Sequence, residues 1–136
     1  MTRYAALIDG ADGAYGVAFP DAPGCTAMGK TMDEAIANAG RALAEWVGYA
    51  VASRLELPDV RPVDELRNDP EVIEQLADGA AIAVVPLVME SGSLVRANLS
   101  IDSGLLAAID EAAERVGLTR SAFLASAAKD KLLGGI

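Results

Sequence analysis

The chain has 136 residues, enough for one modest domain and one small module, with 52% hydrophobic residues and a formal net charge of −9 at pH 7. Its single cysteine excludes an intramolecular disulfide framework, and the absence of histidine excludes histidine acid–base chemistry and histidine metal ligands. The longest apolar run, residues 80–89, is too short to span a bilayer, and no secretion signal opens the chain, so we expect a cytoplasmic protein with no membrane partner.

The negative charge is confined to one part of the chain. Residues 1–93 carry 15 acidic and 6 basic side chains, whereas residues 94–136 carry 5 of each. The first part would repel nucleic acid and attract a basic partner, while the second could bind DNA only by presenting its few cations on one face. The alternative is that the acidic residues only make the surface soluble.

The N-terminal part predicts a hairpin and a third strand. Residues 3–8 and 15–19 have the composition of strands, and the turn between them, residues 9–13, is rich in Asp and Gly. Residues 20–24 contain two prolines and a glycine, which break the chain before a short strand at residues 25–28.

A long amphipathic helix follows these strands. Thr31 and Glu34 form a capping box, and the apolar residues after it recur at helical spacing to about Ser53. The expected buried stripe consists of Ile36, Ala39, Leu43, Trp46, Val47 and Ala50. We expect Cys25, which has no histidine to activate it, to be a small buried side chain.

A polar, proline-containing stretch separates this helix from the last strand of the N-terminal part. The sequence Asp69-Pro70-Glu71 predicts the start of a short helix that ends near residue 78. The strand at residues 81–89 contains Pro86, which places it at a sheet edge or at a bulge. Residues 90–93, with two serines around a glycine, predict a flexible linker. We therefore divide the chain into domains 1–90 and 94–136.

The C-terminal domain begins with a strand pattern and continues with two helices. In residues 95–101 the odd positions are apolar, so a strand would place Arg96, Asn98 and Ser100 together on one face. Asp102 or Ser103 caps a first helix that ends at Gly117, and Thr119 caps a second. Lys129 and Lys131 lie near the end of the second helix, where positive charge is favoured.

A lone strand cannot satisfy its backbone groups, but two copies pairing their strands antiparallel would do so. We therefore expect a homodimer, alone or assembled into a tetramer. Such a two-stranded ribbon fits the DNA major groove, where Arg96, Asn98 and Ser100 would contact bases. The free backbone N–H groups around Thr119, Arg120 and Ser121 would hold a phosphate.

This C-terminal pattern closely resembles the ribbon-helix-helix family over about forty residues. In that family the strand positions contact bases, and the start of the second helix anchors the DNA backbone. The alternative is a strand and helical hairpin that only dimerise.

The N-terminal motifs resemble the HicB family of antitoxins. The resemblance rests on Gly16-Val17-Ala18-Phe19-Pro20-Asp21-Ala22-Pro23-Gly24-Cys25, followed by Gly29-Lys30-Thr31-Met32-Asp33-Glu34-Ala35. It implies an α+β fold over residues 3–89, a truncated ribonuclease H-like (βββαβ) domain without nuclease function. The ribbon-helix-helix domain is one of the C-terminal modules of this family. The stretch from Pro58 to Asp78 is longer than a minimal member needs.

The resemblance also implies a function and two partners. The N-terminal domain would bind and block a small, basic, RNA-cleaving toxin of the HicA type, and the C-terminal dimer would bind operator DNA and repress the shared promoter. A second reading is a stand-alone transcriptional regulator whose N-terminal domain senses a ligand or supports oligomerisation. Gene context discriminates between the two, because an antitoxin needs a short reading frame for the toxin beside it.

A nuclease is a third reading, and it would need several carboxylates converging on metal ions. The candidate carboxylates in or beside turns are Asp9, Asp12 and Asp21, and those on the long helix are Asp33, Glu34 and Glu45. Their spacing is poor for one cluster. We therefore expect no enzyme activity, no catalytic residue, no metal site and no cofactor.

Overall fold

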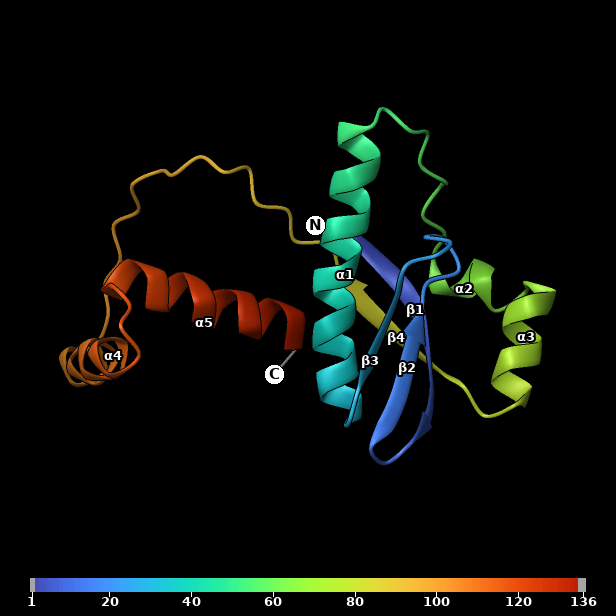
Figure 1. Cartoon of the computed structure of the whole chain (residues 1–136), viewed down its shortest axis with the longest axis horizontal. Coiled ribbons are helices and arrows are strands. Elements are labelled where there is room, and N and C mark those ends of the chain that lie inside the picture. The colour runs from blue at the N-terminus through green and yellow to red at the C-terminus, as the bar shows by residue number, and fades with distance from the viewer. Residues whose placement is uncertain (1, 135–136) are drawn as a thin grey trace.

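A computed structural model describes residues 2–134, which form an N-terminal α+β domain followed by a pair of helices (Figure 1). The elements are β1 (Arg3–Ala11), β2 (Ala14–Ala18), β3 (Thr26–Gly29), α1 (Met32–Ala52), α2 (Val63–Leu66), α3 (Pro70–Ala77), β4 (Ala81–Pro86), α4 (Ser103–Arg115) and α5 (Arg120–Gly134). No helix within this described range is both long and apolar enough to cross a membrane.

The strands form one antiparallel sheet with the order β3-β2-β1-β4. β1 does not end near Ile8, as the sequence predicted, but continues to Ala11, which pairs with Ala14 across a two-residue turn. The Asp- and Gly-rich segment is therefore largely strand. Gly10 permits this because its φ is +115°, and a Cβ there would collide with the Ala14 carbonyl oxygen.

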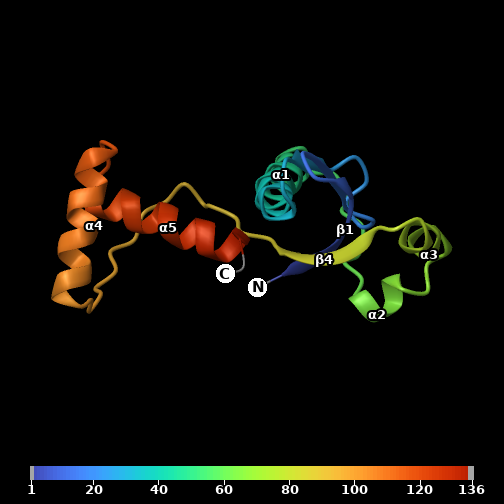
Figure 2. The same cartoon turned by 90° about the horizontal axis from the view of Figure 1, so that it is seen from below.

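Helices cover both faces of the sheet (Figure 2). Along β1 the side chains alternate, so that Tyr4, Ala6 and Ile8 pack in the core beneath α1. Ala5 and Leu7 point to the opposite face and pack in a second core with residues of α2 and α3. This arrangement explains why β1 shows no alternation of apolar and polar residues, since both of its faces are buried.

Helix α1 begins and ends close to the predicted residues. The Glu34 backbone N–H donates to Thr31 Oγ1 at 3.1 Å, which confirms the predicted N-terminal cap. The buried residues of α1 are Ala35, Ala39, Gly40, Leu43, Val47 and Ala50. Trp46 is half-buried against the same core, and its indole Nε1 donates to the Pro23 carbonyl oxygen at 3.2 Å.

The polar stretch after α1 contains a short helix, α2, that the sequence analysis missed. Its Leu66 is 1% exposed and belongs to the second core. The predicted start of α3 is confirmed, because the Glu71 backbone N–H donates to Asp69 Oδ1 at 2.9 Å and Pro70 opens the helix. The extra stretch therefore folds as a helical cover for one face of the sheet.

Strand β4 lies at the edge of the sheet, as its proline predicted. It ends at Pro86, opposite Arg3, rather than continuing to Met89. Proline has no N–H group to donate to the ladder, and one further backbone hydrogen bond, from the Leu87 N–H to the Thr2 carbonyl oxygen at 2.8 Å, follows it.

The caps of the two C-terminal helices are confirmed. Asp102 Oδ2 accepts from the Leu105 N–H at 3.0 Å, and Gly117 has a φ of +72° after the end of α4. Thr119 Oγ1 accepts from the Ala122 N–H at 3.1 Å. The predicted strand at residues 95–101 is not formed in the single chain, where residues 87–102 lie outside every helix and strand. The pairing predicted for it needs a second copy.

Candidate nucleic-acid interface

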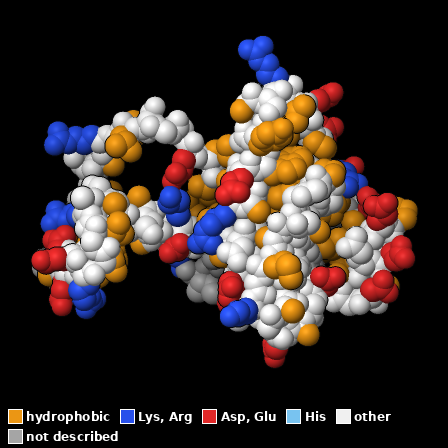
Figure 3. All heavy atoms as spheres, viewed as in Figure 1, with side chains coloured by type: hydrophobic (Ala, Val, Ile, Leu, Met, Phe, Trp, Pro, Cys, Tyr) orange, Lys and Arg blue, Asp and Glu red, His pale blue; other side chains and the backbone are white. Residues whose placement is uncertain are grey.

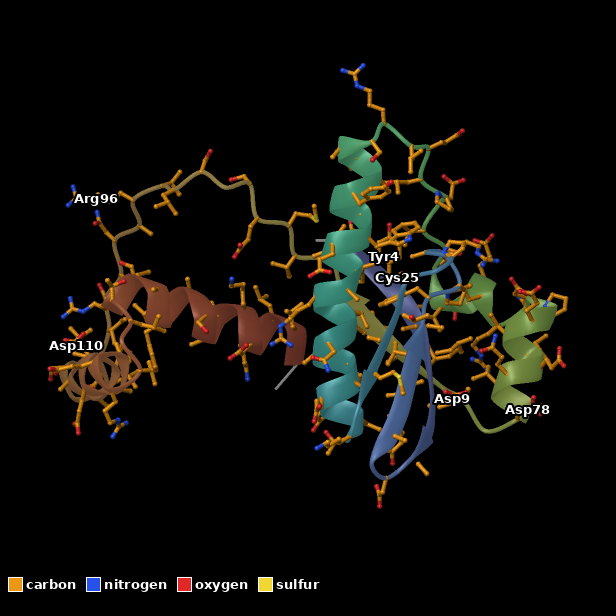
Figure 4. All side chains as sticks on the ribbon, in the orientation of Figure 1. Tyr4, Asp9, Cys25, Asp78, Arg96 and Asp110 are labelled. Atoms are coloured by element: carbon orange, nitrogen blue, oxygen red, sulfur yellow. The ribbon has the colours of Figure 1, made fainter. Side chains whose placement is uncertain are left out.

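The segment before α4, residues 95–101, exposes both apolar and polar side chains to solvent. Val95 is 89% exposed and Leu99 is 66% exposed, although both are apolar. The intervening Arg96 and Asn98 are exposed as well, and Figure 4 shows Arg96 projecting away from the rest of the molecule. Arg96 forms no ion pair with any described residue. The segment thus has an apolar side without a covering and a polar side free to bind.

Helices α4 and α5 are tied together by an ion pair. Arg120 Nε donates to Asp110 Oδ1 at 2.8 Å, and Arg120 Nη2 donates to Oδ2 at 2.7 Å. These hydrogen bonds hold the pKa of the Asp110 carboxyl below its usual value and raise the pKa of Arg120. The Arg120 guanidinium is therefore already occupied within the chain, which leaves only the backbone N–H of Arg120 available to a ligand.

The start of α5 presents free backbone donors. Thr119 caps the helix through its own side chain, and its carbonyl oxygen accepts from the Phe123 N–H at 2.9 Å. Over the range that the structure describes, the backbone N–H groups of Thr119, Arg120 and Ser121 have no protein acceptor. Such a helix start is suited to an anion. No hydrogen bond or ion pair joins these residues to Arg96, Asn98 or Ser100 in the described chain.

Apolar residues of the helical pair are exposed in the same way as those of the preceding segment. Ile109 and Ala113 of α4 are buried. The exposed apolar side chains are Leu105 (56%), Val116 (62%), Leu118 (42%) and Leu132 (41%). A pair of helices with so small a buried core is incomplete by itself.

The end of α5 packs against α1, a contact that the sequence did not predict. Leu133 is 7% exposed and lies over Gly40, where an added Cβ would come within 2.5 Å of Leu133 Cδ2. Lys129 Nζ lies 2.7 Å from Glu90 Oε1 beside this contact. A cleft of about 410 Å³ opens between α1, α5 and the segment after β4. Lys129 is thus engaged by a carboxylate rather than left free near the helix end.

A partly buried ionic cluster joins the turn before β3 to the α2–α3 stretch. Asp21 is 5% exposed, and its carboxylate accepts from the Arg61 backbone N–H and from Arg61 Nε, both at 2.8 Å. Arg61 Nη1 also donates to Asp69 at 2.9 Å, which lowers the pKa of Asp69. The sequence analysis took Asp21 for a turn residue. Asp21 does lie in that turn, and the structure adds a role that the sequence analysis missed, because Asp21 also anchors a segment forty positions away in the chain.

The other residues considered for chemistry have structural surroundings. Cys25 is 4% exposed, as expected, and burial raises the pKa of its thiol. Tyr4 packs edge-on against Phe19, with ring centroids 6.3 Å apart. Tyr15 donates its hydroxyl hydrogen to Asp12 at 3.2 Å. Among residues 2–134, no three Asp, Glu, Cys or His side chains are grouped so that they could hold a metal ion.

The fold is therefore an α+β domain joined to a helical pair that carries an exposed, alternating segment. Residues 4–128 match the family of HicB-like antitoxins of bacterial toxin–antitoxin systems, and the chain belongs to this family. This finding confirms the family named from the N-terminal motifs.

Individual relatives extend over nearly the whole chain. An uncharacterized 14.9 kDa protein from the rep–hol intergenic region of Haemophilus phage HP1 (strain HP1c1) is 30% identical over 132 residues, 96% of this chain and 97% of that protein. The crystal structure of the antitoxin HicB of Burkholderia pseudomallei is 32% identical, with a TM-score of 0.56, and the match covers 97% of this chain and 99% of that one.

A chain of the HicA3 and HicB3 toxin–antitoxin complex is similar to the first part of the molecule. It is 21% identical, with a TM-score of 0.52, and the match covers 65% of this chain and 99% of that chain. At this identity the likeness concerns the fold alone.

Proposed function

We propose that this antitoxin binds and neutralises a small RNA-cleaving toxin of the HicA type and, as a homodimer, represses its own operon by binding operator DNA. Membership of the HicB-like family supports the first role, together with the fold shared with a chain of a HicA3–HicB3 complex. In this proposal the protein acts by binding and not by catalysis. Its N-terminal domain holds the toxin, and residues 94–136 hold the DNA.

One observation carries the DNA-binding role, namely the exposed alternation at residues 95–101. Val95 and Leu99 are the apolar positions, and leaving such side chains in water forgoes roughly 1.5–3 kcal/mol each. A second copy of the segment, paired antiparallel, would cover them and would also satisfy the free backbone groups. The same pairing would gather the two sets of polar residues on the opposite face.

The resulting ribbon would enter the major groove of DNA. Arg96 can donate two hydrogen bonds to a guanine, Asn98 can pair with an adenine, and Ser100 tolerates either. The free N–H groups of residues 119–121 would hold a backbone phosphate and fix the register of the ribbon. The Arg120 side chain takes no part, since it remains paired with Asp110.

The test is growth and transcript integrity in cells that express the small reading frame beside this gene, alone and together with residues 1–136. We expect growth arrest with loss of RNA, which the chain reverses, and binding of the purified chain to the DNA upstream of the gene. DNA binding without any toxicity to relieve would favour a stand-alone regulator. Rescue without DNA binding would leave an antitoxin that does not repress.

A further inference from the structure

The α2–α3 stretch carries most of the excess negative charge of the protein. Residues 59–78 contain seven acidic and two basic side chains, a net charge of −5 out of −9 for the chain. In Figure 3 red side chains gather on the side of the molecule where α2 and α3 lie. The acidic residues are Asp59, Asp64, Glu65, Asp69, Glu71, Glu74 and Asp78.

Only one of these carboxylates is neutralised within the protein. Arg61 is taken up by Asp21 and Asp69, and Arg67 forms no ion pair with a described residue. The remaining six acidic side chains likewise have no ion-pair partner in the part of the chain that the structure describes. Like charges held this close repel one another, so the arrangement opposes the stability of the stretch.

Packing of the α2–α3 stretch against the sheet does not require this negative charge. Its contribution to the core comes from the inward-facing residues Val63, Leu66, Val72 and Leu76. The outward face is free of that constraint, and a mixture of both signs there would avoid the repulsion between like charges. The large excess of negative charge therefore indicates a partner with the opposite charge.

The surface beside α3 also has the shape of a contact site. A cleft of about 320 Å³ lies between α3 and the turn before β3, with Phe19, Pro20 and Pro23 on one side and Glu71 on the other. Ile73, on the outer side of α3, is 50% exposed. The Arg61 cluster bridges the two walls, because it joins Asp21 of the turn to Asp69 at the start of α3. Apolar groups surrounded by charged ones are the usual composition of a protein interface.

We propose that this α2–α3 surface is the docking site for the basic, RNA-binding face of the toxin and that its carboxylates take the places of RNA phosphates. The inference rests on the proposed antitoxin role. A protein that cleaves RNA must present cations to a polyanion, and an antitoxin surface with the charge of RNA would cover those same cations. Neutralisation would then follow from competition with the substrate.

The test reverses charge on α3 without disturbing the Arg61 cluster. Glu74 and Asp78 are exposed, unpaired and one helical turn apart, and lysine near the end of a helix is favourable to it. The variant is Glu74→Lys/Asp78→Lys, and the matched control is Glu56→Lys/Glu114→Lys, which changes two other exposed carboxylates by the same charge. Binding of each full-length chain to the protein from the adjacent reading frame is measured by titration calorimetry at several salt concentrations.

We expect the α3 variant to bind the toxin at least about tenfold more weakly and with a smaller salt dependence, and the control to stay within about twofold of wild type. Retained affinity for the upstream DNA shows that the variant is folded. If both variants bind the toxin as wild type does, the α2–α3 site is wrong and the antitoxin role stands. If the wild-type chain does not bind the toxin, the antitoxin role and the site are both wrong.

Discussion

The two parts of this chain differ in how far they complete their own folding. In the N-terminal domain, α1 covers one face of the sheet and α2 and α3 cover the other, and large apolar side chains such as Leu43 and Leu66 are fully buried. In residues 94–134, exposed apolar side chains outnumber the buried ones. The N-terminal domain therefore covers its own core, whereas the C-terminal part leaves most of its large apolar side chains exposed.

The difference also separates the two proposed contacts. The N-terminal domain can offer a rigid surface whose charge selects a partner, because the fold of this domain does not depend on that partner. In our proposal the C-terminal part acquires its binding face only when two copies pair, so DNA binding depends on dimerisation. Changes that lie away from the contact between α1 and α5 should consequently leave the other part folded.

Introducing charge on the apolar side of residues 95–101 should have the largest effect. Val95→Asp/Leu99→Asp should abolish the dimer, because each copy would lose the burial of two side chains worth roughly 1.5–3 kcal/mol each and would bring unpaired carboxylates into the interface. Sedimentation equilibrium measures the change. The fluorescence of Trp46, the single tryptophan, should report unchanged unfolding of the N-terminal domain. A variant that remains dimeric at micromolar concentration would contradict the ribbon.

Removal of Arg61 should be the next largest change, and it should act on the other part of the molecule. Arg61→Ala leaves the carboxylate of Asp21 buried and unpaired, which should cost roughly 2–3 kcal/mol, below the range for a fully buried pair because the Arg61 side chain is 30% exposed. Urea unfolding followed by Trp46 fluorescence measures it. Arg67→Ala is the matched control and should stay within about 0.5 kcal/mol of wild type. Equal losses of stability in Arg61→Ala and Arg67→Ala would mean that the ionic cluster does not stabilise the domain.

Loss of a base contact should weaken DNA binding without weakening the dimer. Arg96→Ala or Asn98→Ala should lower specific affinity for the operator by roughly 1–3 kcal/mol per lost bidentate contact. Toxin inhibition should not change. Fluorescence anisotropy with labelled operator DNA gives the affinity, and Arg115→Ala, an exposed arginine on α4, is the control. Unchanged affinity in both strand variants would mean that the segment does not enter the groove.

The sequence predicted the features that depend on near neighbours. The caps at Thr31, Asp69, Asp102 and Thr119 each involve a backbone N–H two or three positions away, and all four are present. The edge position of β4 follows from one property of Pro86 and is also present. These signals are local, so they can be read without knowing the fold.

The features that the sequence did not predict join distant parts of the chain. Asp21 meets Arg61 across forty positions, and Leu133 meets Gly40 across more than ninety. Helix α2 is only four residues long, too short for a periodic pattern, and its place depends on the sheet face that it covers. The base-contacting residues and the division at residues 90–94 remain predictions, since the surface that would test them forms between two copies.

The smallest expected effect is a difference in response to acid and salt. Asp69 and Asp110 each have a pKa held below the usual value of about 3.9, first of all by a hydrogen bond from an arginine. Each pair therefore stabilises its region fully above about pH 4, and the contribution disappears as the pH falls through the lowered pKa. Circular dichroism and Trp46 fluorescence should accordingly both show weaker folding below pH 4.

The two ion pairs should differ in their response to salt, because the Asp110–Arg120 pair is the more exposed. The side chains of Asp110 and Arg120 are 44% and 54% exposed, whereas those of Asp69 and Arg61 are 24% and 30% exposed, so added salt should screen the Asp110–Arg120 pair more. Asp110→Asn should remove the salt-sensitive part of the acid response and leave the Trp46 signal unchanged, because the two pairs stabilise separate units.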